Sequence, residues 1–249
     1  MAVIGTITHL FESPVKGLAR LSKHSIGIST TTGVVGNHQF GIWRSSEPFD
    51  GRWHDKHSFY AGCNTQGIAN IIPRFRNGDT ADPEVRELDP ACIGEIALKL
   101  GLEENGLTVV NTKGRFALGN TEGPIVSVGN MATIREIEKE AGVPGLFMHY
   151  RMDVYVDGLP PFVEYDWVGD GVEMGGLQFD AVDDCRRCRS ATQSPQSGQW
   201  NATLLKPLMK VMAGRYYWSK DHKNPLVMGI LLKPRAEGRL FINGHVARA

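Results

Sequence analysis

The residues best suited to chemistry are Cys185 and Cys188, two cysteines three positions apart among arginines. The alternating apolar positions of residues 172–182 predict a strand that leads to them. The segment after them is rich in Ser, Thr, Gln, Pro and Gly, which predicts a turn. The pair therefore has four interpretations: half of a zinc site, a thioredoxin-like dithiol, two structural cysteines, or a thiolate in a positive field.

The first three interpretations each need a particular context. A structural zinc site needs four ligands, and because Cys63 and Cys92 are isolated in the sequence, only His54 and His57 could complete a mixed site. A thioredoxin-like dithiol lies at the N-terminus of a helix, whereas residues 190–198 are poor helix formers. Two cysteines without any reaction are common in protein cores.

The fourth interpretation rests on the arginines. Arg186, Arg187 and Arg189 would favour the anionic form of a nearby thiol by opposite charge. Their planar guanidinium groups also donate hydrogen bonds in pairs to anions. This combination suits a metal or cofactor that carries its own phosphate.

The residues after the cysteines extend the pattern, with a threonine at Thr192 and then a turn, Ser194-Pro195-Gln196-Ser197-Gly198. The whole segment resembles MOSC-domain proteins (molybdenum cofactor sulfurase C-terminal domain), in which Cys-x-Arg-Cys is followed by Thr and an Asp-Pro-x-Thr-Gly turn. In that family the second cysteine is the thiolate ligand of molybdenum in a pterin-bound cofactor.

The resemblance implies site residues around the cysteines and near the N-terminus. Cys188 would be the metal ligand and the catalytic residue, and Cys185, Arg186 and Arg187 would lie beside the cofactor. The stretch Ser13-Pro14-Val15-Lys16-Gly17 is similar to the family's Tyr-Pro-Val-Lys-Ser.

In that family the lysine of this stretch contacts the cofactor phosphate, which makes Lys16 a cofactor-binding candidate. Gly17 has no hydroxyl, but its backbone N–H could donate to an oxyanion. Without the resemblance, Lys16 would be a solvated loop lysine, as most lysines are.

His38 is a departure from the family pattern, which has Gly-Asp-Arg where this chain has Gly36-Asn37-His38. A histidine binds phosphate either as imidazolium or as a single neutral donor, whereas an arginine is always charged. If His38 binds as imidazolium, we expect the cofactor to be held less tightly at alkaline pH.

Four further candidates follow in the middle of the chain. Ser127 and Asn130 stand where a strand enters a helix predicted from about residue 132 to 141, and they match the family's donors there. The free N–H groups of a helix start attract anions, but simple N-capping explains Asn130 equally well. Arg151 matches the family's cofactor arginine, and Asp153 stands where the family has Asn. A carboxylate there would repel phosphate unless it paired with Arg151.

The composition excludes several classes of protein. The 27 basic and 27 acidic residues balance, so no global charge attracts nucleic acid or a membrane. Four cysteines in 249 residues are too few for a disulfide scaffold, and no run approaches the roughly 20 apolar residues that cross a bilayer. The first residues do not form the basic segment followed by an apolar segment that is typical of a secretory signal, so the chain is expected to be cytoplasmic.

The predicted fold is mainly β with a few helices, because 29 glycines and 13 prolines favour many turns. The resemblance implies an N-terminal β domain over residues 1–110 and a MOSC β-barrel over residues 111–249. Asp89 and Pro90 predict the start of a helix that ends at Gly101, as an insertion in the first domain. The cofactor site is expected between Lys16, Arg151 and the cysteine segment.

The function that the resemblance implies is that of the amidoxime-reducing and related MOSC enzymes. These are molybdenum-dependent oxidoreductases that reduce N-hydroxylated or similarly oxygenated small molecules, and pyridoxal phosphate binding is also associated with the family. Because the chain has no Fe–S cysteine set, a separate flavin or Fe–S protein would donate the electrons. The alternatives are a sulfur-carrier or cofactor-delivery protein and a diverged barrel without a cofactor.

Overall fold

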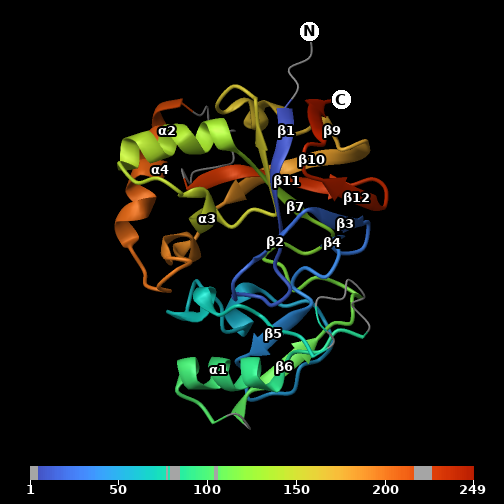
Figure 1. Ribbon diagram of the computed structural model, residues 1–249, viewed down its shortest axis with the longest axis vertical. Helices are drawn as coiled ribbons and strands as arrows, with labels where there is room; N and C mark the ends of the chain where they lie inside the picture. Colours follow the sequence, from blue (N-terminus) through green and yellow to red (C-terminus); the bar gives the residue numbers. More distant parts are fainter. Residues whose placement is uncertain (1–4, 77, 79–84, 104–105, 216–225) are drawn as a thin grey trace.

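The computed structural model describes residues 5–76, 78, 85–103, 106–215 and 226–249, and it confirms a mainly β fold with short helices (Figure 1). The strands are β1 Gly5–Glu12, β2 Leu21–Lys23, β3 Ser25–Ser29, β4 Gly33–Val34, β5 Phe40–Trp43, β6 Thr108–Asn111, β7 Val126–Asn130, β8 Val154–Asp157, β9 Gly171–Met174, β10 Leu177–Arg186, β11 Val227–Pro234, β12 Gly238–Phe241 and β13 His245–Arg248. The α-helices are α1 Pro90–Leu100, α2 Met131–Ala141, α3 Phe147–Tyr150 and α4 Leu205–Arg215. Short 3₁₀ helices are η1 Lys56–Ser58, η2 Ile68–Asn70, η4 Val163–Trp167, η5 Arg189–Thr192 and η6 Ala202–Leu204.

Seven of the described strands close into a barrel, in the order β13-β9-β10-β11-β7-β8-β1 and back to β13. Neighbouring strands are antiparallel except β7 and β8, which are parallel and connected through α2 and α3. Closure pairs every barrel strand on both sides, so the ring leaves no open edge. Strand β2 pairs with the far end of β1.

The barrel encloses the larger apolar core. Ile7 of β1 and Ile230 of β11 are fully buried in it. Helices α2 and α4 lie side by side against one flank of the barrel, as Figure 1 shows. They add Ile134 and Leu208 to the same core.

Helix α2 forms where the sequence predicts it, within one residue of its expected start. Asn130 caps it by accepting a hydrogen bond from the backbone N of Ala132 at 3.0 Å. Gly142 ends it with a φ of 64°, a left-handed conformation that a residue without Cβ adopts at little cost.

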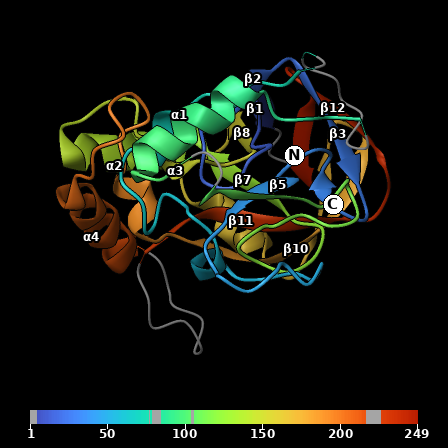
Figure 2. The same cartoon turned by 90° about the horizontal axis from the view of Figure 1, so that it is seen from below.

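A second core lies below the barrel, around the antiparallel pair β5 and β6 and helix α1 (Figures 1 and 2). Its buried apolar residues are Val15, Leu18, Phe40, Ile42, Ile68, Ile71, Leu88, Cys92 and Ile96. Helix α1 forms where the sequence predicts it: Asp89 accepts from the backbone N of Ala91 at 2.7 Å, and Gly101 ends the helix in the left-handed conformation.

The two cores do not follow a simple division of the chain. Strand β1 is part of the barrel, and β3 pairs with β12 near the C-terminus. The second core, by contrast, draws its residues from positions 15–96. The predicted boundary between residues 110 and 111 therefore stays a prediction.

A buried ion pair connects the segment before α1 to the barrel. A guanidinium nitrogen of Arg86 contacts Oε1 of Glu12 at the end of β1, and the Arg86 side chain is only 1% exposed. Lys23 lies 3.3 Å from the other oxygen of Glu12. Because Arg86 and Glu12 are both buried, removal of Arg86 would leave the Glu12 carboxylate with Lys23 but without its buried partner.

One element of the sequence analysis was wrong. Residues 172–182, predicted as one strand, form parts of two antiparallel strands, β9 and β10. The chain reverses at Gly175 and Gly176, whose φ values of 58° and 82° suit a tight hairpin turn. The second strand of the hairpin, β10, carries Cys185 near its C-terminal end.

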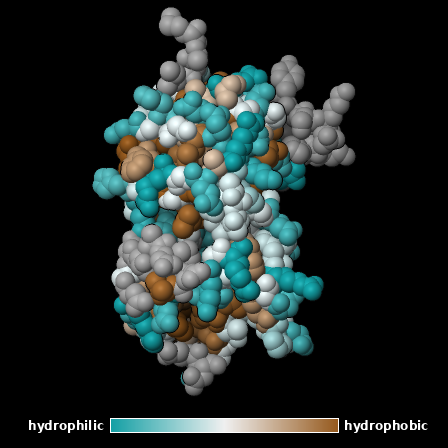
Figure 3. Space-filling model, turned by 90° about the vertical axis from the view of Figure 1, so that its right-hand side faces the viewer, coloured by the Kyte–Doolittle hydropathy of each residue, from teal (hydrophilic) through white to brown (hydrophobic). Residues whose placement is uncertain are grey.

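The surface gives no sign of a membrane-spanning helix. Within the described ranges, every helix is too short or too polar to cross a bilayer. Figure 3 shows one face that is mostly hydrophilic, with apolar residues in small separate groups.

Candidate functional site

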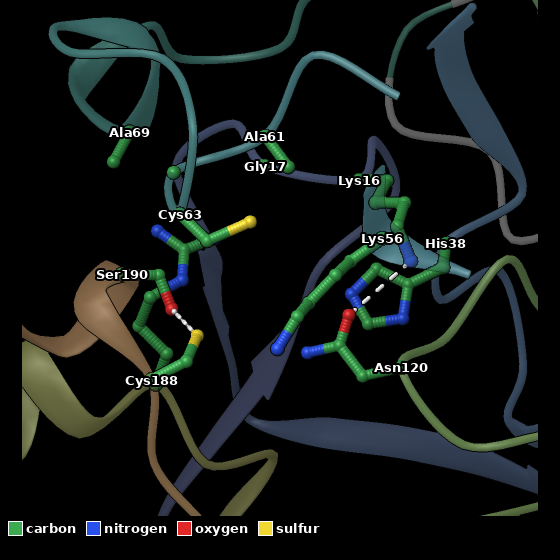
Figure 4. Close-up of a pocket in the computed structure, with 12 residues that line it drawn as sticks. Lys16, Gly17, His38, Lys56, Ala61, Cys63, Ala69, Asn120, Cys188 and Ser190 are labelled. Atoms are coloured by element: carbon green, nitrogen blue, oxygen red, sulfur yellow. Dashed lines mark hydrogen bonds between the residues drawn. The ribbon is translucent and has the colours of Figure 1, made fainter. Parts of the chain in front are cut away.

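A cleft of about 610 Å³ lies between the barrel strands β7 and β10 and the loops around Lys56 and Asn120. A smaller recess of about 70 Å³ adjoins it, and Figure 4 shows its lining. Residues that line both include His38, Arg151 and Cys188, so the two spaces form one continuous site. The size of the cleft is typical of sites for small molecules and cofactors, which range from about 300 to about 1,000 Å³.

The fold brings most of the predicted site residues to this place. The small recess is lined by Lys16, Gly17, His38, Arg151 and Cys188. The larger cleft is also lined by Ser127, Asp153, Cys185, Arg186 and Arg187. Residues distant in the sequence thus meet around one cavity, as the resemblance implied.

Asn130 lies outside the lining of both spaces. It is fully buried, and besides capping α2 it donates to Pro160 O and to Glu164 Oε2, each at 2.8 Å. Its amide is therefore occupied inside the protein. The N-capping interpretation is confirmed, and the prediction that Asn130 contacts a cofactor has no support in the structure.

Cys188 presents its sulfur to the recess, just before η5. Its Sγ lies 3.0 Å from the hydroxyl of Ser190. Interaction with the neighbouring Cys63 thiol and with Ser190 lowers the pKa of Cys188 to about 4, against the effect of burial. Lys56 across the recess acts in the same direction. The lowered pKa favours the thiolate form of Cys188, in agreement with the fourth interpretation of the cysteine pair.

Cys63 is a site residue that the sequence analysis did not identify. It lines the same recess as Cys188, and both thiols are free and partly exposed (Figure 4). Interaction with Cys188 and burial raise the pKa of Cys63, so this thiol keeps its proton. An isolated cysteine carries no motif, and only the tertiary fold reveals its partner.

Hydrogen bonds hold the two cysteine segments against each other. The Gln193 side chain accepts from the backbone N of Ala69 at 2.8 Å and donates to Thr65 O at 2.9 Å. Trp200 Nε1 donates to Gly62 O at 3.1 Å, on the residue before Cys63. The turn after Cys188 therefore serves to dock the loop that carries Cys63.

Cys185 has a different environment from Cys188. It is 7% exposed, and a guanidinium nitrogen of Arg187 contacts its sulfur. Burial raises the pKa of Cys185. The two cysteines stand at the end of β10 and just before the short 3₁₀ helix η5, not at the start of an α-helix, which is not the arrangement of a thioredoxin-like dithiol.

The mixed zinc site is not formed either. Among the described residues, no group of three or more His, Cys, Asp or Glu side chains is placed to hold a metal ion. His54 instead pairs with Asp50, at 2.7 Å between Nε2 and Oδ1.

Lys16 is buried rather than solvated, which excludes the surface-lysine interpretation. Its ammonium donates to Gly119 O at 3.0 Å and to Asn120 Oδ1 at 3.3 Å, and it also contacts Leu118 O. Burial lowers the pKa of Lys16 to about 8. Gly17 follows with a φ of 91°, and a Cβ there would lie 2.8 Å from Ala61 Cα, so a serine would not fit without a shift.

His38 is neutral in this environment. Burial, followed by the charges of Lys16 and Arg151, lowers the pKa of His38 to about 3. Without a bound anion, His38 can offer a single neutral donor, and this environment does not favour the imidazolium form. The expected loss of cofactor binding at alkaline pH stays a prediction.

Arg151 and Asp153 do not pair with each other. The guanidinium of Arg151 contacts Leu18 O, and burial lowers the pKa of Arg151 to about 10, which leaves it charged at neutral pH. Asp153 accepts hydrogen bonds from Asn37 Nδ2 at 2.7 Å and from Ser127. Burial raises the pKa of Asp153, while these donors act in the opposite direction.

The charges around the joined spaces favour an anion. Of the lining residues that the structure describes, five are basic and three are acidic: Lys16, Lys56, Arg151, Arg186 and Arg187 against Asp153, Asp183 and Asp184. Tyr150, only 2% exposed, also lines the cleft, and its hydroxyl has no hydrogen-bond partner among the described residues. A buried hydroxyl without a partner is unfavourable, so a bound polar ligand would relieve it.

These features fit a pterin cofactor that carries phosphate and a metal. The cleft has room for an organic ring system, and basic side chains surround it. The thiolate of Cys188, which lines both the cleft and the recess, is a soft ligand. The donor set is therefore compatible with the cofactor that the sequence resemblance implies.

Comparisons with known proteins give one distant sequence relative. No family model matches the chain. The chain is 26% identical, over 42% of its length, to a protein described as molybdenum cofactor sulfurase from Caenorhabditis briggsae. The matched region is 16% of that relative, so the chain corresponds to a small part of it.

Among solved structures, the YUAD protein from Bacillus subtilis aligns over 99% of this chain and 96% of its own. The TM-score of 0.47 and the 9% identity are too low to support any inference about this chain.

Proposed function

We propose that this chain is a MOSC-type protein that binds a pterin molybdenum cofactor and reduces a small N-hydroxylated or similarly oxygenated molecule. The observation that carries the proposal is the thiolate of Cys188 where the recess meets a basic cleft. The distant similarity to a molybdenum cofactor sulfurase supports the same cofactor.

Each part of the site has a role in this proposal. Cys188 holds the metal through its sulfur, because its pKa leaves it deprotonated at neutral pH. Arg151, Arg186 and Arg187 bind the phosphate, and Tyr150 donates its free hydroxyl to the cofactor or substrate. Lys16 supports the wall of the recess through its bonds to the 118–120 loop.

When bound, the cofactor supplies two-electron redox chemistry at its metal. The chain contributes binding, orientation and charge. Electrons would come from a separate flavin or Fe–S protein, since none of the cysteines that the structure describes form a cluster site.

A sulfur-carrier or cofactor-delivery role is the second candidate. Cys63 favours it, because a second thiol beside a reactive cysteine can displace a sulfur atom bound to that cysteine. In that case Cys188 would carry a persulfide and the chain would not turn over a substrate.

The test is the metal and pterin content of protein from a host that makes the cofactor. Near-equimolar molybdenum and pterin in the wild type, with molybdenum lost or its coordination changed in Cys188→Ala, is the expected result. Cys92→Ala is the matched control, because Cys92 is fully buried in the second core.

The opposing results are equally clear. Folded wild-type protein without molybdenum or pterin would reject the proposal and point to a diverged barrel. Persulfide on Cys188 without reductase activity would favour the sulfur-carrier role.

A further inference from the structure

The four cysteines fall into two classes by burial. Cys92 and Cys185 are buried, whereas Cys63 and Cys188 are partly exposed and line the same small recess. Figure 4 shows the two partly exposed thiols on the same side of that recess, away from Lys16 and His38. The Cys-x-x-Cys motif suggests a relationship between Cys185 and Cys188, but in the fold it is Cys63 that lines the recess together with Cys188.

The pairing of Cys63 with Cys188 is built into the backbone around them. Cys63 lies in a tight turn in which the backbone N atoms of Asn64 and Thr65 donate to Ala61 O at 3.0 and 2.8 Å. Gly67 N donates to Gly198 O at 2.9 Å, which joins this loop to the turn after Cys188. The two thiols are therefore held near each other in the folded chain, whatever occupies the larger cleft.

Cys185 is turned away from this pair. Its sulfur contacts the guanidinium of Arg187, which also donates to the carbonyl of Tyr150. These contacts hold the side chain of Cys185 in place at the end of β10. A bond between Cys185 and Cys188 would have to break them.

We propose that Cys63 is the resolving thiol of Cys188, and that small disulfides such as oxidised glutathione convert the two cysteines into an intramolecular disulfide. The Cys188 sulfur attacks one sulfur of the small disulfide, forms a mixed disulfide and releases one thiolate. The Cys63 sulfur then attacks the Cys188 sulfur, forms the Cys63–Cys188 bond and releases the second thiol. The protein gives up two electrons and two protons, and the small disulfide is reduced to two thiols.

The inference goes beyond the proposed function, because the cysteine pair is present in the chain without any cofactor. The disulfide would lie across the recess and remove the sulfur of Cys188 as a ligand. A small-molecule disulfide would thus determine whether the Cys188 sulfur is available to a ligand in the cleft.

The test uses cofactor-free protein that is first reduced and then incubated with oxidised glutathione. Remaining thiols are alkylated, and intact mass and peptide mapping identify the products. We expect the wild type to lose two alkylatable thiols and to yield a linked peptide that contains Cys63 and Cys188. In Cys63→Ser, a glutathione adduct on Cys188 should persist as the main product. Cys92→Ser should behave like the wild type.

Three results would overturn the inference. They are a linked Cys185–Cys188 peptide in the wild type, a glutathione adduct on Cys188 as persistent in the wild type as in Cys63→Ser, and no reaction in the wild type. If Cys63→Ser does not fold, the wild-type peptide map still decides. None of these readouts depends on molybdenum, so this inference and the proposed function can fail separately.

Discussion

Asp153 accepts two hydrogen bonds from Ser127, one from its backbone N at 2.8 Å and one from its hydroxyl at 2.7 Å. A third comes from Asn37. The carboxylate therefore ties the start of β8 to β7 and to the loop that carries His38. Its role in the structure is to position these segments of the cleft.

Replacement of Asp153 by alanine should leave buried donors of Ser127 and Asn37 without an acceptor. We expect the free energy of unfolding to fall by about 3 kcal/mol, since each such loss costs about 1–3 kcal/mol. Urea denaturation measures the change. Asp166→Ala is the control, because Asp166 is exposed, and its effect should stay within about 0.5 kcal/mol. Equal effects of the two substitutions would contradict the role of Asp153.

The alkylation rate of Cys188 should hardly change with pH in the neutral range. Its lowered pKa, about 4, means that the thiolate persists as the pH falls and is lost only near that value. An ordinary thiol, with a pKa of about 8.5, instead slows about tenfold for each pH unit below it. Iodoacetamide labelling of Cys188, followed by mass spectrometry between about pH 5.5 and about pH 8, measures the profile.

The same labelling experiment tests the role of Cys63. Cys63→Ala removes the neighbouring thiol whose interaction lowers the pKa of Cys188, so this pKa should rise and labelling should slow at the acidic end. Cys92→Ala, in the second core, should leave the profile unchanged. A wild-type rate that declines with pH like that of an ordinary thiol would show that Cys188 is not a stabilised thiolate.

Removal of the Arg86 side chain should destabilise the protein strongly. Arg86→Ala would leave the buried Glu12 carboxylate with Lys23 but without Arg86, and loss of one partner of a buried pair costs up to about 3–5 kcal/mol. Arg76→Ala is the matched control, because Arg76 pairs with Glu87 at 3.6 Å on the surface, where such pairs contribute about 1 kcal/mol or less. Urea denaturation of both variants gives the comparison, and similar midpoints would be the contrary result.

Arg151→Gln should reduce cofactor retention. The substitution removes a charge that lines both the cleft and the recess, and hydrogen bonds to charged groups contribute about 1.5–3 kcal/mol, or roughly tenfold to 100-fold in affinity. Pterin content after gel filtration measures retention. Lys206→Gln, on the exposed side of α4, should retain as much pterin as the wild type. Unchanged retention in Arg151→Gln would remove Arg151 from the binding site.

Local sequence signals predicted helices α1 and α2 well. Asp89 and Asn130 are N-caps whose side chains accept hydrogen bonds from free N–H groups, and Pro90 follows Asp89 as the first residue of its helix. Gly101 and Gly142 end the two helices in a left-handed conformation. The error at residues 172–182 had a local cause too. The alternation of apolar residues predicts one strand across Gly175 and Gly176, but two adjacent glycines are typical of a hairpin turn.

The site was only partly predictable. Cys188 and Arg151 could be identified because their neighbours in the sequence form patterns. Cys63 has no such neighbours, and its proximity to Cys188 depends on the docking of Gln193 and Trp200 against its loop. The low pKa of His38 likewise depends on burial and on charges from distant segments, which no local pattern contains.

The closure of the barrel has a consequence for folding during synthesis. β1 leaves the ribosome before the other barrel strands, yet its two barrel neighbours are β8 and β13, which are made much later. Until β13 is complete, one edge of β1 has no barrel partner, and exposed strand edges of this kind favour aggregation. Pairing across so much of the chain also slows folding. The end of β1 at Gly5 and Thr6 should therefore stay without its barrel partner until the last strand emerges.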